Sequence, residues 1–375
     1  MIIGVPKEIK DKEFRVGVVP AGVKSFTNRG HTVLVETNAG TGSGIFDEEY
    51  QENGATIISG AEELYKRSDM IIKVKEPLEP EFPLLRPGLI LYTYLHLAPL
   101  PKLTDLLLEK KIIGIGYETV RLDNGFLPLL APMSEVAGRM SIQVGAHFLE
   151  REQGGRGILL GGVPGVSHGH VTILGSGTVG SNGARIALAM GASVTVFGRN
   201  RQRLADLENL FAGRLNTLIS SRHNIEEELK EADLVIGAVL LPGKSAPRLI
   251  TREMLSLMKK GSVIVDVAID QGGCAETSRP TSHSDPVFTV DGVIHYCVAN
   301  MPGAVPRTST FALTGATLPL ALEIADKGVE QAANDSPALA RGINVYLGKL
   351  VSREVAESQD RKSFDLFKEC LHGSG

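Results

Sequence analysis

The chain has 375 residues, enough for two domains of ordinary size, and its 43% hydrophobic and 22% charged residues are typical of a globular protein. Its formal net charge of -4 gives no electrostatic basis for binding nucleic acid or an anionic membrane surface. The N-terminus lacks the apolar segment of a signal peptide, and no stretch is apolar enough to span a bilayer. Three cysteines (Cys274, Cys297 and Cys370), not in metal-ligand spacing, predict reduced thiols in a cytoplasmic protein without a metal site.

Residues 1–125 alternate short apolar runs with helical patterns. Strands are predicted at Ile2–Val5, Thr32–Glu36, Met70–Val74, Leu89–Tyr94 and Ile112–Ile115. Helices are predicted at Ala21–Arg29, Ala61–Tyr65 and Lys102–Glu109. Such alternation favours a parallel sheet covered on both faces. Because no glycine-rich phosphate loop occurs here, this domain is predicted to hold the substrate.

A long helical pattern over residues 133–151 is expected to lead from the first domain into the second. Ser134 stands where an N-cap would be. The apolar residues on one face of this helix are Val136, Met140, Val144 and Phe148. Five glycines between Gly154 and Gly162 then predict a flexible loop.

The segment Val171–Asn200 carries the strongest motif. Four β-prone residues run into three glycines spaced G-x-G-x-x-G (Gly175, Gly177 and Gly180), and a helical pattern and a second apolar run, Val194–Phe197, follow. This order of strand, turn, helix and strand is the context that a dinucleotide-binding motif requires. The three glycines would permit the sharp turn, the approach of a pyrophosphate and close packing of the helix on the sheet, and the helix N-terminus favours the anion. The alternative is a structural glycine turn.

The end of the second strand of this motif departs from the usual pattern. NAD-binding units place an acid there to accept from the ribose hydroxyls, but this chain has Gly198, followed by Arg199, Arg201 and Arg203. Arginine suits the 2′-phosphate of NADP. The same arginines are equally compatible with the solvated start of a helix, so both interpretations stay open.

The rest of the chain continues the alternation and then becomes helical. Strands are predicted at Leu234–Val239, Val263–Val267 and Ile294–Val298, and helices over 308–333 and Ala338–Ser358. The last helices are expected to return and complete the first domain. The prediction is therefore an α/β protein of two Rossmann-like domains with parallel sheets flanking a cleft, joined by long helices. Residues 1–128 with 308–375 would form the substrate domain, and residues 129–307 the NAD(P)-binding domain.

Five polar residues lie at strand ends or in loops, where α/β folds place their sites: Arg15, Lys75, His96, Asp270 and Asn300. Arginine can grip a carboxylate bidentately, a strand-end lysine can bind a carboxylate or polarise a carbonyl, and histidine suits proton transfer. The acid after a buried strand would lie beside a nicotinamide, and the amide would contact cofactor or substrate.

Four of these residues also have a structural interpretation. Arg15 would be a surface arginine, Lys75 an exposed strand terminus and His96 a core or rim histidine. Asn300 would begin a turn. Asp266, inside a strand, is interpreted as a structural partner, and Glu118 as a structural or weak ion contact.

Long blocks of the sequence resemble the alanine dehydrogenase family over essentially the whole chain. The similar blocks are residues 4–8, 13–16, 73–77, 94–98, 133–139, 161–166, 266–274, 276–285 and 298–306. The resemblance implies reversible oxidative deamination of L-alanine to pyruvate and ammonia with NAD in a homohexamer.

The resemblance also implies roles for residues. Arg15 and Lys75 would clamp the substrate carboxylate with Asn300 nearby, and His96 would be the general acid/base, assisted by Asp270. The positions that match cofactor contacts are Ser134, Gly175, Gly177, Thr178, Val179, Gly180, Gly198, Arg199, Arg203, Ser220, Val239, Leu240, Val267, Asp270, Arg279, Val298, Asn300 and Met301. Gly198 replaces the aspartate of the family pattern, which leaves NADP as an alternative to NAD. The alternative functions are a saccharopine-type amino-acid reductase and the soluble nucleotide-binding subunit of a transhydrogenase.

Overall fold

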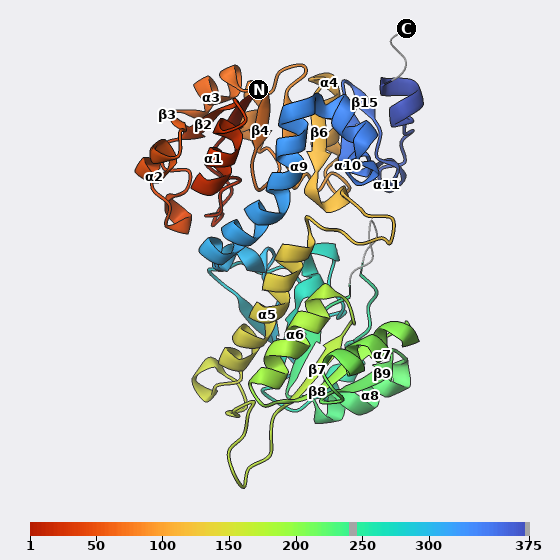
Figure 1. Ribbon diagram of the computed structural model, residues 1–375. Coiled ribbons are helices and arrows are strands. Elements are labelled where there is room, and N and C mark those ends of the chain that lie inside the picture. The colour runs from red at the N-terminus through yellow and green to blue at the C-terminus, as the bar shows by residue number, and fades with distance from the viewer. Residues whose placement is uncertain (240–245, 372–375) are drawn as a thin grey trace. The chain divides into compact units, whose positions relative to one another are not determined.

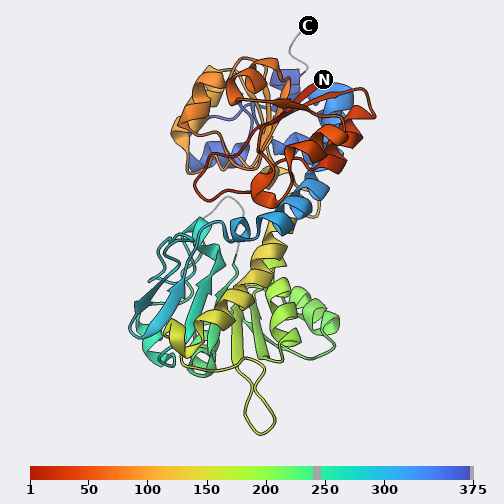
Figure 2. The same cartoon turned by 90° about the vertical axis from the view of Figure 1, so that its left-hand side faces the viewer.

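The chain folds into two compact units, each built on one sheet (Figures 1 and 2). The computed structural model describes residues 1–239 and 246–371. Unit 1 is Met1–Met133 with Val305–Gly375, and unit 2 is Ser134–Ala304. The predicted α/β class with two Rossmann-like domains is confirmed.

The sheet of unit 1 has eight strands in the order β15-β14-β6-β5-β4-β1-β2-β3. They are β1 (Ile2–Val5), β2 (Thr32–Glu36), β3 (Thr56–Ile58), β4 (Met70–Ile72), β5 (Ile90–Thr93), β6 (Ile113–Gly116), β14 (Ile343–Tyr346) and β15 (Lys349–Leu350). Strands β1 to β6 are parallel, whereas β14 pairs antiparallel with β6, and β15 with β14.

The sheet of unit 2 has seven strands in the order β12-β13-β11-β10-β7-β8-β9. They are β7 (His170–Leu174), β8 (Ser193–Gly198), β9 (Asn216–Ile219), β10 (Leu234–Gly237), β11 (Val263–Asp266), β12 (Val287–Val290) and β13 (Val293–Tyr296). All neighbours are parallel except β12, which is antiparallel to β13.

Both sheets therefore contain the same doubly wound order, in which the chain moves outward from a central strand, returns to its other side and moves outward again. This order places the topological switch point between β1 and β4 in unit 1 and between β7 and β10 in unit 2. Ligands of open α/β sheets bind at the carboxyl ends of the strands beside that point. The loops after these strands are accordingly where a site is expected in each unit.

Helices pack against both sheets and bury their apolar faces there. They are α1 (Pro20–Thr27), α2 (Asp47–Glu52), α3 (Ala61–Arg67), α4 (Pro101–Glu109), α5 (Ala131–Phe148), α6 (Thr178–Ala189), α7 (Arg201–Leu210), α8 (Arg222–Glu231), α9 (Pro306–Asp335), α10 (Pro337–Gly342) and α11 (Arg353–Ser358). The inner strands are buried along their whole length, for example β4, β5 and β10, as expected for sheets covered on both faces, whereas the outer strands β9 and β12 are partly exposed. Helix α9 is interrupted at Gly328, which has a φ of 79°.

Both sheets are mainly parallel, as predicted, and each adds antiparallel strands at one edge, namely β12 in unit 2 and β14 with β15 in unit 1. Two predictions about local structure were wrong. The predicted helix Ala338–Ser358 is instead α10, a hairpin of β14 and β15, and α11. Leu347 and Gly348 turn the chain with positive φ, and the hairpin buries Ile343 and Val345 beside β6, which a helix could not do. Ser134 is not an N-cap, because α5 already begins at Ala131 and includes Pro132 in its first turn, where proline is tolerated.

Candidate active site

Three of the predicted site residues in unit 1 lie in loops that follow adjacent strands. Arg15 lies in the segment after β1, Lys75 follows β4, and His96 follows β5. These strands are parallel neighbours, so their carboxyl ends lie at one edge of the sheet. The fold thus brings residues from three separate parts of the sequence to the edge where a ligand is expected.

Arg15 is a buried cation, not the surface residue that its structural interpretation predicted. Its side chain is 2% exposed, and its Nε donates to Glu13 Oε1 at 2.7 Å while Nη2 donates to Glu13 Oε2. Burial opposes ionisation, but the hydrogen bonds and charge of Arg15 lower the pKa of Glu13 to about 2. Its Nη1 points to Met133 Sδ, 3.1 Å away. Glu13 occupies the Nε edge, so a ligand carboxylate would approach the guanidinium from another side.

Lys75 is also buried rather than an exposed strand end, with 9% of its surface accessible. Burial, together with the charge of Arg15, lowers its pKa. The Glu8 carboxylate, in the segment after β1, accepts the backbone N–H groups of both Val74 and Lys75, and burial raises the pKa of Glu8. This contact fixes the backbone from which the Lys75 side chain extends.

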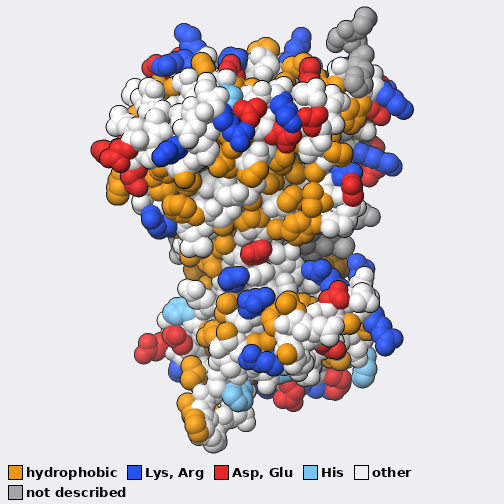
Figure 3. Space-filling model, in the orientation of Figure 1, with side chains coloured by type: hydrophobic (Ala, Val, Ile, Leu, Met, Phe, Trp, Pro, Cys, Tyr) orange, Lys and Arg blue, Asp and Glu red, His pale blue; other side chains and the backbone are white. Residues whose placement is uncertain are grey.

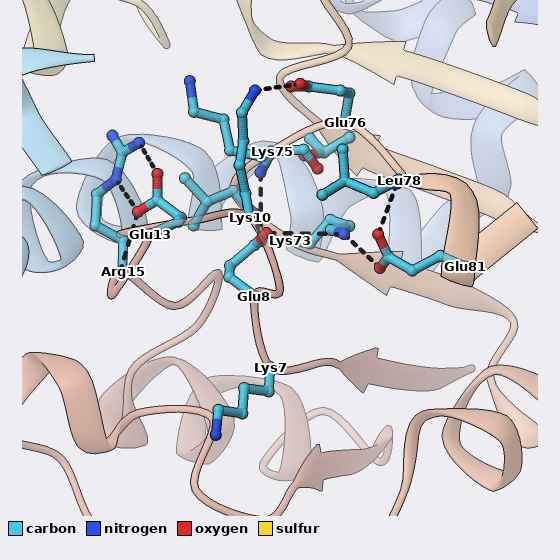
Figure 4. Close-up of polar contacts among 12 residues, drawn as sticks. Lys7, Glu8, Lys10, Glu13, Arg15, Lys73, Lys75, Glu76, Leu78 and Glu81 are labelled. Atoms are coloured by element: carbon cyan, nitrogen blue, oxygen red, sulfur yellow. Dashed lines mark hydrogen bonds and ion pairs between the residues drawn. The ribbon is translucent and has the colours of Figure 1, made fainter. Parts of the chain in front are cut away.

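Three other cations near Lys75, namely Arg15, Lys10 and Lys73, have carboxylate partners (Figure 4). Lys10 pairs with Glu76. Lys73 is fully buried, pairs with Glu81 and lies 3.7 Å from Glu8 Oε2. Among the described residues, no carboxylate lies within ion-pair distance of Lys75 Nζ. A buried ammonium without a counter-ion is costly, so a bound carboxylate would supply the missing charge.

His96 is half-buried and has an unusual backbone conformation, with a φ of 48°. Its ring stacks on that of Tyr94, with centroids 5.6 Å apart and planes 10° apart. The residues that the structure describes make no hydrogen bond to its imidazole nitrogens, which are therefore available to a ligand. An imidazole in the loop next to the one that holds Lys75 can exchange protons with a ligand bound at this edge of the sheet.

In unit 2 the glycine motif has the geometry that a dinucleotide requires. Gly175 has a φ of 127°, and a Cβ there would lie 2.4 Å from the carbonyl oxygen of Ala238, so the turn needs glycine. A Cβ on Gly180 would lie 1.9 Å from Gly175 O. By contrast, a Cβ on Gly177 would meet no atom of the described residues within 4 Å, which leaves open space among them at the N-terminus of α6. This open space at a helix N-terminus fits a pyrophosphate.

The end of β8 is crowded around Gly198. A Cβ there would lie 2.7 Å from Ser176 Oγ and 2.8 Å from Leu204 Cδ2. Arg203 is exposed, and its Nε donates to Ser176 O at 2.7 Å. Asn200 caps α7, so Arg201 and Arg203 lie in the first turn of a helix. Arg199, Arg201 and Arg203 are all exposed.

Asp266 is buried and hydrogen-bonded, in keeping with its interpretation as a structural partner, whereas Asp270 is exposed. Asp270 is exposed, in the short helix η6 (Val267–Gln271) after β11. Asp266 ends β11, is 1% exposed, and its Oδ2 accepts from Cys274 N, Ala275 N and Ser278 Oγ. These hydrogen bonds tie the end of β11 to residues 274–278 and so hold together the two ends of the loop that contains Asp270.

The remaining predicted positions lie mostly in the loops at the carboxyl ends of the unit 2 strands. Thr178 and Val179 begin α6; Ser220 follows β9; Val239 follows β10; Val267 follows β11; Val298, Asn300 and Met301 follow β13. Asn300 has a φ of 61° and its carbonyl accepts from Gly303 N, so it does begin a turn. Arg279 is exposed and its guanidinium lies 4.2 Å from the Phe288 ring centroid. Ser134 lies inside α5, and Leu240 lies outside the described residues.

Sequence reasoning missed two carboxylates near the unit 1 residues, Glu8 and Glu13, which both lie in the segment after β1. Glu118, which was interpreted as a structural or weak ion contact, follows β6 and accepts the backbone N–H of His96. The only signal was position, since each comes shortly after a buried strand of a parallel sheet. Their partners lie on other loops or in a local turn, which periodicity does not reveal.

On the face drawn in Figure 3, basic and acidic side chains are interspersed over each unit. Among the described residues, no helix combines the length and apolarity that a bilayer crossing requires.

Comparisons with known proteins agree along nearly the whole chain. Residues 4–137 match the family model "Alanine dehydrogenase/PNT, N-terminal domain", and residues 141–353 match "Alanine dehydrogenase/PNT, C-terminal domain". A curated alanine dehydrogenase of Methanococcus maripaludis is 56% identical over 361 residues, covering 96% of this chain and 97% of the relative. A solved L-alanine dehydrogenase superposes with a TM-score of 0.93 at 50% identity, covering 96% and 99% of the two chains.

A transhydrogenase from Sinorhizobium meliloti superposes with a TM-score of 0.81 at 23% identity, covering 94% of this chain and 99% of the other. That likeness shows a shared fold. The sequence matches are far stronger and include the segments that hold Arg15, Lys75, His96 and Asp270. The chain belongs to the alanine dehydrogenase/PNT family.

Proposed function

We propose that this protein is an alanine dehydrogenase, which reversibly converts L-alanine and water to pyruvate and ammonia with transfer of a hydride to NAD. The observation that carries the proposal is the buried ammonium of Lys75, without a carboxylate partner among the described residues, at the sheet edge that also holds His96. A small carboxylate substrate fits that arrangement. The close relatives named alanine dehydrogenase support the choice of alanine.

Lys75 and Arg15 bind and orient the substrate carboxylate, and Asn300 is assigned to substrate binding by resemblance alone. Lys75 supplies the charge, and Arg15, held by Glu13, supplies a fixed guanidinium. Holding the carboxylate sets the direction of the Cα–H bond, and positioning of this kind contributes much of the rate of such reactions.

The glycine turn at Gly175, Gly177 and Gly180 and the N-terminus of α6 would hold the pyrophosphate of the cofactor. The other positions predicted to contact the cofactor, including Thr178, Val179, Ser220, Val239, Val267, Arg279, Val298 and Met301, are assigned to it by resemblance. When bound, the nicotinamide accepts the hydride that leaves Cα.

His96 and Asp270 manage the protons of the remaining steps. His96 takes a proton from the water that adds to the imine carbon to form a carbinolamine, and returns this proton to the nitrogen. The hydroxyl proton then leaves as the carbonyl of pyruvate forms, the C–N bond breaks and ammonia departs. Asp270, exposed on its loop after β11, assists these transfers on the nicotinamide side. Together they convert the imine and water into pyruvate and ammonia.

The cofactor is proposed to be NAD, as the resemblance implies, with NADP as the alternative that Gly198 favours. No carboxylate stands at position 198 to accept from the ribose hydroxyls or to repel a 2′-phosphate. The exposed Arg199 and Arg203 lie next to the glycine motif. Comparing kcat/KM for the two cofactors decides between them.

We also propose that the protein assembles as a homohexamer and acts on small molecules in the cytoplasm, which mass measurement in solution and fractionation would test. Two other functions remain alternatives: a saccharopine-type amino-acid reductase and the nucleotide-binding subunit of a transhydrogenase. Comparing ammonia with a lysine-type amine as co-substrate separates the first. Alanine-dependent reduction of NAD by the isolated chain separates the second.

The central test is His96→Ala. We expect kcat for alanine oxidation to fall about 10²–10⁴-fold, the usual contribution of general acid/base catalysis, with the Kd for NAD nearly unchanged. His168→Ala, an exposed histidine in the loop before β7, is the matched control and should keep wild-type turnover. Wild-type-like turnover in His96→Ala would remove this residue from the mechanism.

A further inference from the structure

Glu118 makes a contact with the backbone of His96 that the proposed function does not use. It lies in η3 (Tyr117–Thr119), which follows β6, while His96 follows the neighbouring strand β5. Its Oε1 accepts the N–H of His96 at 2.7 Å, and its Oε2 accepts the N–H of Leu95 at 3.3 Å. Two successive backbone donors thus converge on one carboxylate.

The backbone conformation at His96 is one that needs support from the surrounding structure. A φ of 48° lies in the left-handed region, which residues other than glycine, asparagine and aspartate seldom adopt. Such residues persist only where surrounding structure holds them, and they cluster at active sites. Successive N–H groups at a left-handed residue form a concave anion-binding nest, and here the Glu118 carboxylate fills it.

The imidazole ring is held through the residue next to Glu118. Tyr94 stacks on the His96 ring, and the rings of Tyr94 and Tyr117 pack in a T-shaped arrangement with centroids 5.0 Å apart and planes at 79°. The Tyr117 hydroxyl donates to the carbonyl oxygens of Lys73 and Tyr92. The short helix η3 therefore supports both the backbone and the ring of His96.

We propose that Glu118 is a positioning residue for the reaction: its carboxylate holds His96 in the left-handed conformation and so aims the imidazole at the substrate. This inference rests on the proposed role of His96 as acid/base. Without the carboxylate, two N–H groups lose their partner and the backbone at His96 can return to negative φ, which turns the side chain away. Binding of the substrate carboxylate depends on Lys75 and Arg15 and would be spared.

The test is a double-mutant cycle on the full chain, with wild type, Glu118→Ala, Glu118→Gln, His96→Ala and the double variant Glu118→Ala/His96→Ala assayed for alanine-dependent NAD reduction. Glu118→Ala should lower kcat about 100-fold, with KM for alanine and NAD within about twofold, since a displacement of about 1 Å costs this much. Glu118→Gln should fall between, because one amide oxygen still accepts while its NH₂ opposes the other N–H. In the His96→Ala background, Glu118→Ala should change the residual rate less than about twofold.

The outcomes separate the two hypotheses. Wild-type protein that does not reduce NAD with alanine contradicts the proposed function. Active wild type with unchanged kcat in Glu118→Ala, or with effects that multiply in the double variant, overturns the positioning role. If Glu118→Ala does not fold, Glu118→Gln decides, and a kcat within about twofold of wild type overturns the proposal. Glu354→Gln, which removes an exposed carboxylate of unit 1 paired with Arg121, is the matched control and should leave kcat unchanged.

Discussion

The guanidinium of Arg15 donates from Nε and Nη2 to the two carboxylate oxygens of Glu13, and both side chains are almost fully buried. A buried cation at the edge of the sheet is therefore fixed in direction before any ligand arrives. The pairing also neutralises its charge, which leaves Lys75 as the cation in this cluster that lacks a carboxylate partner within the described residues.

Replacing Glu13 should destabilise the protein. Glu13→Gln removes the carboxylate that accepts two hydrogen bonds from the buried Arg15 guanidinium, which we expect to cost about 3–5 kcal/mol of unfolding free energy. Urea unfolding at pH 7 measures this. Glu63→Gln breaks an exposed pair with Arg67 and should change stability by less than about 0.5 kcal/mol. Equal effects of the two substitutions would show that the Glu13–Arg15 pair contributes no more than a surface pair.

The contribution of Glu13 should also depend on pH. Its pKa is about 2 in the folded protein against an ordinary value of 4.5, so its stabilisation is complete above pH 4.5 and is lost as the pH falls towards 2. The difference in stability between wild type and Glu13→Gln should therefore shrink between pH 4.5 and 2. Urea titrations across this range test it, and a difference that stays constant would contradict the pairing.

The activity should decline at alkaline pH as Lys75 loses its proton, and the decline should begin below the pKa of an ordinary lysine. Burial and the charge of Arg15 lower its pKa from 10.5, so the ammonium loses its proton at lower pH and with it the attraction for a carboxylate. We expect kcat/KM for pyruvate to fall as the pH rises towards 10.5. Lys75→Arg keeps its charge over this range, so its kcat/KM should be lower at neutral pH but should lack this alkaline decline. A parallel decline in both proteins would assign the limit to another group.

Changing the second or the third glycine of the motif to alanine should affect different properties: cofactor affinity for Gly177 and stability for Gly180. Gly180→Ala places a Cβ 1.9 Å from Gly175 O, so we expect a loss of about 1–3 kcal/mol in stability. Gly177→Ala meets no atom of the described residues within 4 Å and its φ of -78° suits alanine, so the melting temperature should hold. Its methyl would occupy the approach of the pyrophosphate, so the Kd for NAD should rise about tenfold or more. Wild-type NAD affinity in Gly177→Ala would place the cofactor elsewhere.

Gly198→Asp should shift cofactor preference towards NAD. The new carboxylate would accept from the ribose hydroxyls and repel a 2′-phosphate, so the ratio of kcat/KM for NADP to that for NAD should fall about tenfold or more. Gly198→Ala introduces the same close contacts with Ser176 and Leu204 without a charge, and it serves as the control. If both variants change the ratio equally, the effect is steric and the ribose does not lie at position 198.

The sequence by itself determined the two α/β units, most strand positions and the glycine turn, because these follow from short-range periodicity and from the backbone freedom of glycine. It also placed Arg15, Lys75, His96 and Asp270 after strands. Only the tertiary structure decided what holds them. Glu8 meets Lys75 across 67 residues and Glu118 meets His96 across 22, since a parallel sheet brings the ends of distant strands to one edge. The hairpin of β14 and β15 was misread as a helix for the same reason: its strand conformation depends on pairing with β6, a partner more than 200 residues away.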